Sequence, residues 1–192
     1  NIKSFKDLEG KTIAAPFGST THYLLLQALK DEGIDPASMK ILDLRPADIA
    51  AAWARGDIDA AWFWEPNLDK AVKRGGNIFM TSGIMEKRGY PTWDVGVVMN
   101  DFAEKYPEYV NKFVKAECDG IDYWIKNPEK TAAIIAEELS LSLDDATRMM
   151  KGTEMVPCDK QLTAQYMGTT GKIGGFADTL VKTSKFLVSE KR

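Results

Sequence analysis

A cluster of hydroxyl residues directly follows a short apolar run near the start of the sequence. The run Lys11–Pro16 ends in proline, and Gly18, Ser19, Thr20 and Thr21 come next. A helix that begins here has unpaired backbone N–H groups and about half a positive charge at its first turn. With the hydroxyl groups, these N–H groups can bind a small anion such as a phosphate, sulfonate or carboxylate. Ordinary helix capping is the alternative, because serine and threonine occupy many N-cap positions.

Aromatic and acidic residues end a second apolar run. Ile58–Trp64 is followed by Glu65 and Pro66. Side chains alternate along a strand, so Trp62 and Trp64 are expected on one face and Phe63 on the other. Trp64 is expected at the carboxyl end of a parallel strand, where ligands of open α/β sheets bind, and its ring can wall a pocket or face a cation. Core packing is favoured for Trp62 and Phe63 and is the alternative for Trp64.

A single carboxylate lies inside a third apolar run. Asp94 interrupts Trp93–Met99, whose valine content predicts a strand that is buried on both faces. A buried carboxylate is costly unless a hydrogen bond, an ion pair or a cationic ligand stabilises it. Asp94 is therefore a candidate for binding a cation, and capping of the backbone at the strand entry is the alternative.

The only histidine, His22, follows the hydroxyl cluster, where an acid–base role is chemically reasonable. However, the sequence has no P-loop, no GxSxG nucleophile elbow and no HExxH motif, and its histidine and cysteine residues lack metal-ligand spacing. These absences favour a binding protein without metal or cofactor over an enzyme.

The first half of the sequence alternates apolar runs with helical patterns. Strands are expected at Lys11–Pro16, Met39–Leu44, Ile58–Trp64 and Asn77–Thr81, with helices between them. This order predicts parallel βαβ units with right-handed crossovers, and therefore an α/β fold.

The second half is helical in pattern. Helices are expected at Asp101–Asn127, Pro128–Leu139, Ser142–Lys151, Lys160–Gly168 and Lys172–Val188. Phe113, Ile121 and Trp124 belong to an apolar stripe on the first of them. The expected strands are too few for all these helices to cover, so we expect a further sheet, either upstream of these residues or in another chain.

Charge and cysteine content limit the function classes. The 192 residues carry 25 Lys and Arg against 28 Asp and Glu, a net charge of −3, so nucleic acid is not an expected partner. No apolar run approaches the ~18 residues of a membrane-spanning helix. Cys118 and Cys158 form no CxxC motif, so ordinary thiols are favoured and a disulfide is the alternative.

The sequence resembles the nitrate/sulfonate/taurine family of periplasmic solute-binding proteins of ABC importers, and its taurine-type members most. The resemblance rests on Lys6–Pro16, Ser19–Tyr23, Ala50–Ala60, Trp64–Pro66, Pro91–Val95 and Asp101–Glu108. It implies an α/β fold of the periplasmic binding protein type II kind, in which two lobes joined by a two-strand hinge close on a ligand.

The resemblance also implies a domain arrangement. Residues 4–96 are expected to form the second lobe around one parallel or mixed sheet, and residues 97–192 to return to the first lobe as a mainly helical segment. The N-terminal part of the first lobe, with its sheet, would be missing from this chain. A homodimer or an exchanged segment is then expected to cover the apolar stripe around Phe113.

The function implied by the resemblance is that of a solute-binding component that delivers taurine, or a related sulfonate or anion, to a membrane permease. The implied ligand-binding residues are Ser19, Thr20, Thr21, His22, Trp64, Glu65 and Asp94. The helix N-terminus would take the sulfonate, Asp94 the ammonium group, and Trp64 the apolar linker, so that both charges are paired. Glu65 would suit a longer or more cationic ligand. The protein is expected in the periplasm, or lipid-anchored outside the cytoplasmic membrane.

Two other functions use the same two-lobe plan. A same-fold enzyme of thiamin-pyrimidine synthesis would make His22 catalytic and use a pyridoxal-type cofactor. The effector-binding domain of a transcription regulator would follow a helix-turn-helix segment.

Overall fold

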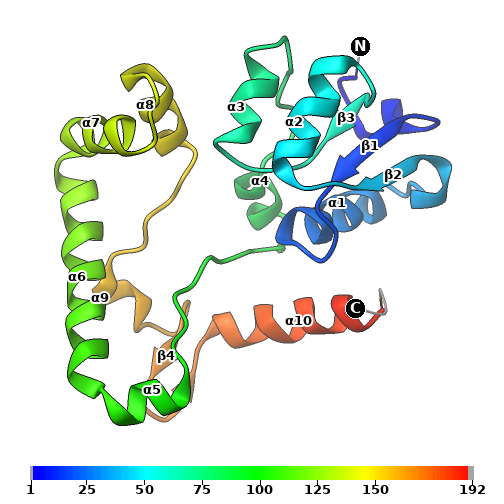
Figure 1. Ribbon diagram of the computed structural model, residues 1–192. Helices are drawn as coiled ribbons and strands as arrows, with labels where there is room; N and C mark the ends of the chain where they lie inside the picture. The colour runs from blue at the N-terminus through cyan, green and yellow to red at the C-terminus, as the bar shows by residue number, and fades with distance from the viewer. Residues whose placement is uncertain (1, 190–192) are drawn as a thin grey trace. The chain divides into compact units, whose positions relative to one another are not determined.

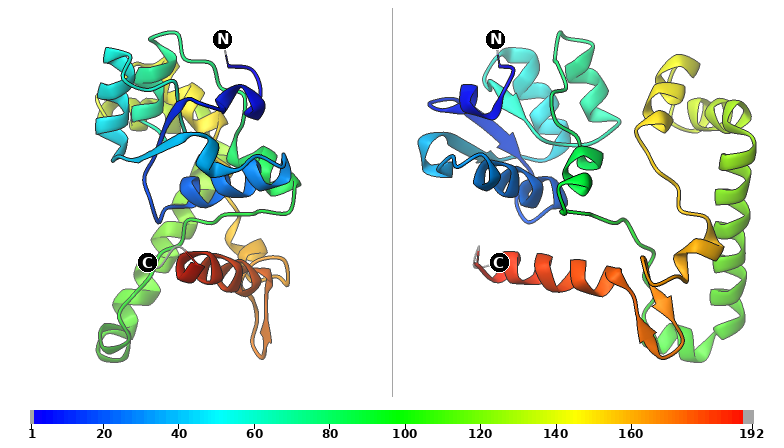
Figure 2. Two further views of the ribbon diagram at one scale, coloured as in Figure 1. Left: turned by 90° about the vertical axis from the view of Figure 1, so that its right-hand side faces the viewer. Right: turned by 180° about the vertical axis from the view of Figure 1, so that it is seen from behind.

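The chain forms two compact units in a computed structural model that describes residues 2–189 (Figures 1 and 2). The first unit contains the residues up to Thr92 together with those from Thr179, and the second unit is Trp93–Asp178. The assignment of residues 4–96 and 97–192 to two lobes stays a prediction. Among the described residues, no helix is both long enough and apolar enough to cross a bilayer.

A parallel sheet of three strands forms the centre of the first unit. Its strands are β1 (Thr12–Ala15), β2 (Lys40–Asp43) and β3 (Ala60–Ala61), in the order β2-β1-β3. The helices α1 (Thr20–Asp31) and α2 (Pro46–Arg55) connect the strands. This arrangement confirms the expected α/β fold with parallel βαβ units.

Different helices cover the two faces of this sheet (Figure 1). Ile13 of β1 shares one apolar cluster with Leu25 of α1, and the next residue, Ala14, shares another with Ile49 of α2. Because side chains alternate along a strand, each face belongs to one helix. We call these the α1 face and the α2 face.

Local signals in the sequence set the helix ends. Ser19 is the N-cap of α1, and its side chain accepts a hydrogen bond from the His22 N–H group. Helix α2 starts with Pro46, whose missing N–H group is not needed there, and ends at Gly56 in the left-handed region (φ 77°). The remaining elements of the unit are the 3₁₀ helices η1 (Phe5–Leu8) and η2 (Pro36–Ser38), and the helices α3 (Asn67–Val72) and α4 (Ser82–Lys87).

The second unit is mainly helical. It contains α5 (Asn100–Lys105), α6 (Pro107–Lys126), α7 (Pro128–Glu138), α8 (Leu143–Lys151), α9 (Cys158–Gln161) and a hairpin of β4 (Gly168–Thr169) and β5 (Lys172–Ile173). The last helix, α10 (Gly175–Ser189), starts in this unit, and its residues from Thr179 belong to the first unit. Ala132, Ala146 and Met150 form a small buried cluster between α7 and α8. The apolar side of α6 is open, since Phe113 is 63% exposed.

Two of the expected strands are absent from the described residues, and a third is short. Asn77–Thr81 and Trp93–Met99 are not strands, and Ile58–Trp64 contributes only Ala60–Ala61. The expected burial of the valine-rich run is also wrong, because Val97 is 90% exposed. Strand formation requires a hydrogen-bonding neighbour, and no described strand pairs with this run.

The C-terminal helix predictions also need correction. The expected helix Lys160–Gly168 is replaced by the short α9 and a turn, and the start of the expected helix Lys172–Val188 belongs to the hairpin. Gly168 adopts φ 93°, and its Cβ position would coincide with backbone atoms of Lys172 and Ile173. Only glycine allows this close approach of the backbones, so the hairpin forms where a helical pattern was expected.

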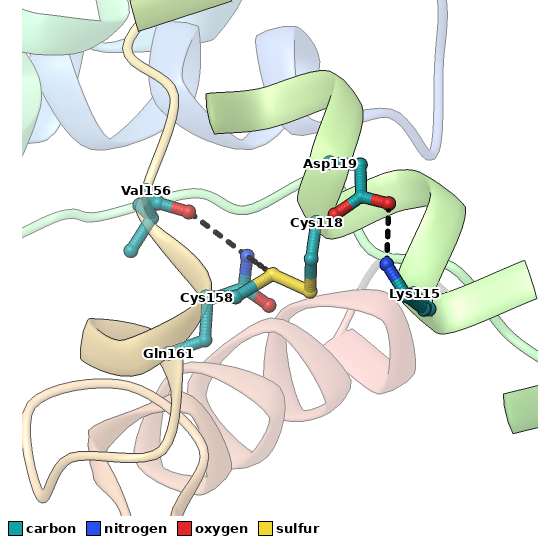
Figure 3. The surroundings of a disulfide bond; sticks show 6 residues. All are labelled: Lys115, Cys118, Asp119, Val156, Cys158 and Gln161. Atoms are coloured by element: carbon teal, nitrogen blue, oxygen red, sulfur yellow. Dashed lines mark hydrogen bonds and ion pairs between the residues drawn. A yellow bond between two sulfur atoms is a disulfide. The ribbon is translucent and has the colours of Figure 1, made fainter. Parts of the chain in front are cut away.

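Cys118 of α6 and Cys158 of α9 form a disulfide bond, with their Cα atoms 5.7 Å apart (Figure 3). The favoured interpretation of two ordinary thiols is therefore wrong. Next to the bond, the Gln161 side-chain amide donates to the Val156 carbonyl oxygen at 2.9 Å. The separation of 40 residues between the two cysteines did not indicate that they pair, because the pairing depends on how α9 folds back onto α6.

Candidate functional site

The turn between β1 and α1 holds the hydroxyl cluster that the sequence singled out. The Ser19 hydroxyl donates to the Pro16 carbonyl oxygen at 2.5 Å, accepts from the His22 N–H group at 3.3 Å, and lies 2.9 Å from Thr21 Oγ1. Thr21 is buried and Thr20 is exposed. The two buried or half-buried hydroxyl groups thus fix the turn, while Thr20 faces solvent.

Side chains elsewhere in the first unit hold the backbone before this turn. The Phe17 N–H group donates to Asp43 Oδ1 at 2.8 Å, and the Gly18 N–H group donates to His22 Nδ1 at 3.4 Å. Asp43, at the end of β2, was missed by the sequence reasoning. Its role follows from the parallel register of β1 and β2, which puts the carboxylate at the end of β2 beside the turn that follows β1.

The first turn of α1 provides the donors for an anion. The Ser19 N–H group donates to the Pro16 carbonyl oxygen at 3.3 Å. The N–H groups of Thr20 and Thr21 have no acceptor among residues 2–189, as expected at a helix start. These two N–H groups, with the positive end of the helix dipole, form what we call the anion cradle.

His22 supports the turn that carries the anion cradle by a hydrogen bond to Gly18. Its side chain is only 2% exposed, and its ring stacks on Phe17 with the ring centres 4.2 Å apart. The edge of Phe186, from α10, lies 5.5 Å from the imidazole centre. Its Nδ1 accepts the hydrogen bond from the Gly18 N–H group and so helps to fix the turn before α1. A direct contact between His22 and a ligand stays a prediction, and so does the catalytic alternative.

Trp64 and Glu65 follow β3 in the same unit. The Trp62 N–H group donates to the Ala14 carbonyl oxygen at 2.9 Å, so pairing with β1 continues beyond Ala61 and places Trp64 past the carboxyl end of the sheet. Trp62 and Phe63 pack on opposite apolar clusters, which confirms core packing for both. Trp64 is 45% exposed, so the core alternative is wrong for this residue.

Glu65 has a local structural role. Its Oε2 accepts a hydrogen bond from the Asp69 N–H group at 2.8 Å, close to the start of α3. A carboxylate at a helix N-terminus is favourable with respect to the helix dipole. Binding of a ligand by Glu65 stays a prediction.

Asp94 lies in the second unit, on the extended segment before α5. The expectation that it is buried is wrong, because the strand around it does not form and its side chain is exposed. The neighbouring Trp93 packs edge-on against Tyr166, with the ring centres 5.1 Å apart. The proximity of Asp94 to the anion cradle stays a prediction.

A separate cavity of about 310 Å³ runs along β3, and Ala60, Ala61 and Phe63 are among the residues that line it. Lys11 and Asp59, which precede β1 and β3, line it together with Trp53 and Phe79. Neither Thr20 nor Thr21 lines this cavity, so it is not the binding pocket of the anion cradle. Within the described part of the chain, no group of His, Cys, Asp or Glu side chains could hold a metal ion.

Comparisons with known proteins relate the chain to sulfonate-binding proteins. A family model described as "NMT1/THI5 like" matches residues 1–131. The chain is 40% identical over 194 residues to the taurine-binding periplasmic protein of Escherichia coli, an alignment that covers 97% of this chain and 58% of that protein. The chain thus spans less than two thirds of the length of this relative.

Two solved structures share the fold. The periplasmic aliphatic sulphonate binding protein SsuA of Escherichia coli matches with a TM-score of 0.73 and 20% identity, over 98% of this chain and 60% of that one. The desulfurization enzyme DSZB matches with a TM-score of 0.59 and 15% identity, over 99% of this chain and 66% of that one. At these identities the matches show the fold alone, and the fold is compatible with binding proteins and with an enzyme.

Proposed function

The chain belongs to the NMT1/THI5-like family, and from this membership we propose that it binds taurine or a related sulfonate as the solute-binding component of an ABC importer. The observation that carries the proposal is the anion cradle, in which the Thr20 and Thr21 N–H groups have no acceptor within residues 2–189. A sulfonate group offers three oxygens and one negative charge to these donors. The 40% identity to the taurine-binding periplasmic protein of Escherichia coli supports this ligand class.

The opposite pole of the ligand is assigned to Asp94. Taurine carries an ammonium group two carbons from its sulfonate, and an exposed carboxylate is a suitable partner for it. Trp64, exposed beyond the carboxyl end of the sheet, offers an apolar surface for the linker. With the sulfonate at the anion cradle and the ammonium group at Asp94, both charges of the ligand would be paired through charge-assisted hydrogen bonds.

A periplasmic location, and with it a membrane permease as partner, is part of the proposal. The relative named above is periplasmic. The Cys118–Cys158 disulfide supports this location, because disulfides persist in oxidising compartments such as the periplasm. A lipid anchor outside the cytoplasmic membrane is the alternative form of this proposed location.

The likeness to DSZB makes catalysis the second candidate function. Binding is favoured because His22, the only histidine, is 2% exposed and accepts from Gly18 through Nδ1. An absorption band of a pyridoxal-type cofactor in the purified protein would favour the same-fold enzyme of thiamin-pyrimidine synthesis.

We also propose that another protein segment buries the apolar stripe on α6. Phe113 and Val114 are more than half exposed on this helix. A second copy of the chain, or an exchanged segment, would remove this apolar surface from water.

Calorimetry on the full chain tests the proposed function. Taurine and ethanesulfonate are titrated into the protein and into Asp94→Asn, with Asp101→Asn as a control that removes the same charge from another exposed site of the second unit. Asp94→Asn is expected to weaken taurine binding by roughly tenfold or more and to leave ethanesulfonate binding unchanged. Equal losses for both ligands would remove Asp94 from the ammonium role, and no binding of either ligand by the unaltered chain would refute the function.

A further inference from the structure

Arg45 lies at the same sheet edge as the anion cradle. In the parallel register, Ala15 of β1 pairs with Asp43 of β2. The Phe17 N–H group, two residues beyond Ala15, still reaches Asp43 Oδ1 at 2.8 Å. Arg45 is two residues beyond Asp43, and it therefore lies beside the turn that leads into α1.

The alternation along β2 places Arg45 on the α1 face. Ile41 packs with the cluster on the α1 face, whereas Leu42 and Leu44 pack with the cluster on the α2 face. Asp43 and Arg45 follow Ile41 at intervals of two residues, and Arg45 keeps an extended backbone with φ −72° and ψ 155°. Alternation continued past Asp43, the last residue of β2, would direct its side chain to the side on which α1 begins.

The charge of Arg45 is not neutralised within the first unit. Its side chain is exposed and has no hydrogen bond or ion pair among the described residues. By contrast, Arg55 at the other end of α2 pairs with Asp57 at 2.6 Å, and Arg88 pairs with Glu32.

Arg45 is also unfavourable for its own helix. It is the N-cap of α2 and makes no side-chain cap. A cation at a helix N-terminus is repelled by the helix dipole, and serine, threonine or asparagine would stabilise the helix better there. A bound anion would reverse this repulsion, because it would interact favourably with the arginine and with both helix starts.

Resting on the proposed function, we propose that Arg45 binds the sulfonate group held by the Thr20 and Thr21 N–H groups. The planar guanidinium group can donate to two oxygens of the anion at once.

The test isolates the anionic pole by using methanesulfonate, which has no ammonium group. The full chain is titrated with methanesulfonate at low ionic strength, and the amide signals of Thr20 and Thr21 are followed by NMR. Arg45→Gln is compared with Arg45→Lys, which keeps the charge, and with Arg55→Gln, which removes the same charge from the far end of α2.

Arg45→Gln is expected to raise the dissociation constant roughly tenfold and to reduce its dependence on salt. Arg45→Lys is expected to lie between it and the unaltered chain, and Arg55→Gln to change the constant less than about twofold. Equal constants for Arg45→Gln and Arg55→Gln would overturn the role of Arg45 and leave the anion cradle standing. If methanesulfonate moves neither amide signal of the unaltered chain, the proposed function itself fails.

Discussion

Removal of the Cys118–Cys158 disulfide is expected to destabilise the second unit selectively. The bond closes a loop with a sequence separation of 40 residues. In the chain-entropy model, a loop of this length corresponds to about 4 kcal/mol of stabilisation. The buried cluster that the loop encloses consists only of Ala132, Ala146 and Met150. We therefore expect the bond to supply a large share of the stability of this unit.

The double variant Cys118→Ser/Cys158→Ser is compared with the unaltered chain by hydrogen exchange during urea unfolding. Amide protons of α7 and α8 are expected to lose up to about 4 kcal/mol of protection. Buried amides of α1 serve as the internal control and are expected to keep theirs, since α1 lies in the other unit. A reductant should give the same result in the unaltered chain and none in the variant. Unchanged protection in α7, or two free thiols in the unreduced native chain, would refute the reasoning.

Three further predictions concern the site, a side-chain link and assembly. His22→Leu is expected to lower the unfolding free energy by about 1 kcal/mol and to weaken sulfonate binding, because the Gly18 N–H group loses its acceptor; calorimetry showing unchanged affinity would contradict the supporting role. Tyr90→Phe is expected to cost about 1 kcal/mol in urea unfolding, because the hydroxyl donates to Asp31 at 2.6 Å. The hydrogen bond to Asp31 also raises the pKa of Tyr90. The stabilisation from this bond is therefore present below the unfolded-state pKa near 10 and is lost as pH rises through the higher folded-state pKa. The Tyr90→Phe variant should not show this loss of stability at alkaline pH. Light scattering is expected to show a dimer that Phe113→Glu disrupts, and a monomeric unaltered chain would count against cover by a second copy.

The sequence was most informative where one local signal is sufficient. The parallel strand order followed from short apolar runs separated by helical patterns, and Ser19 marked the start of α1 as expected. The Thr20 and Thr21 N–H groups without acceptors were expected for the same reason, because a helix start always leaves N–H groups without intrahelical acceptors, and anion binding by them stays a prediction.

Features that depend on distant neighbours were not predicted. The run Trp93–Met99 has the composition of a buried strand, yet a strand exists only where another strand offers hydrogen bonds. The disulfide and the Phe186–His22 contact each join residues that are far apart in the sequence. Asp43 was overlooked because its role becomes visible only when the register with β1 is known.

The exposed run Val95–Met99 has a practical consequence for the isolated chain. It is extended, uncharged and free of proline, and Val97 and Met99 are 90% and 75% exposed. Such segments add readily to the strands of other molecules and start cross-β aggregates. We therefore expect concentrated solutions to bind thioflavin T after a lag, and a lysine at position 97 to act as a gatekeeper that lengthens this lag.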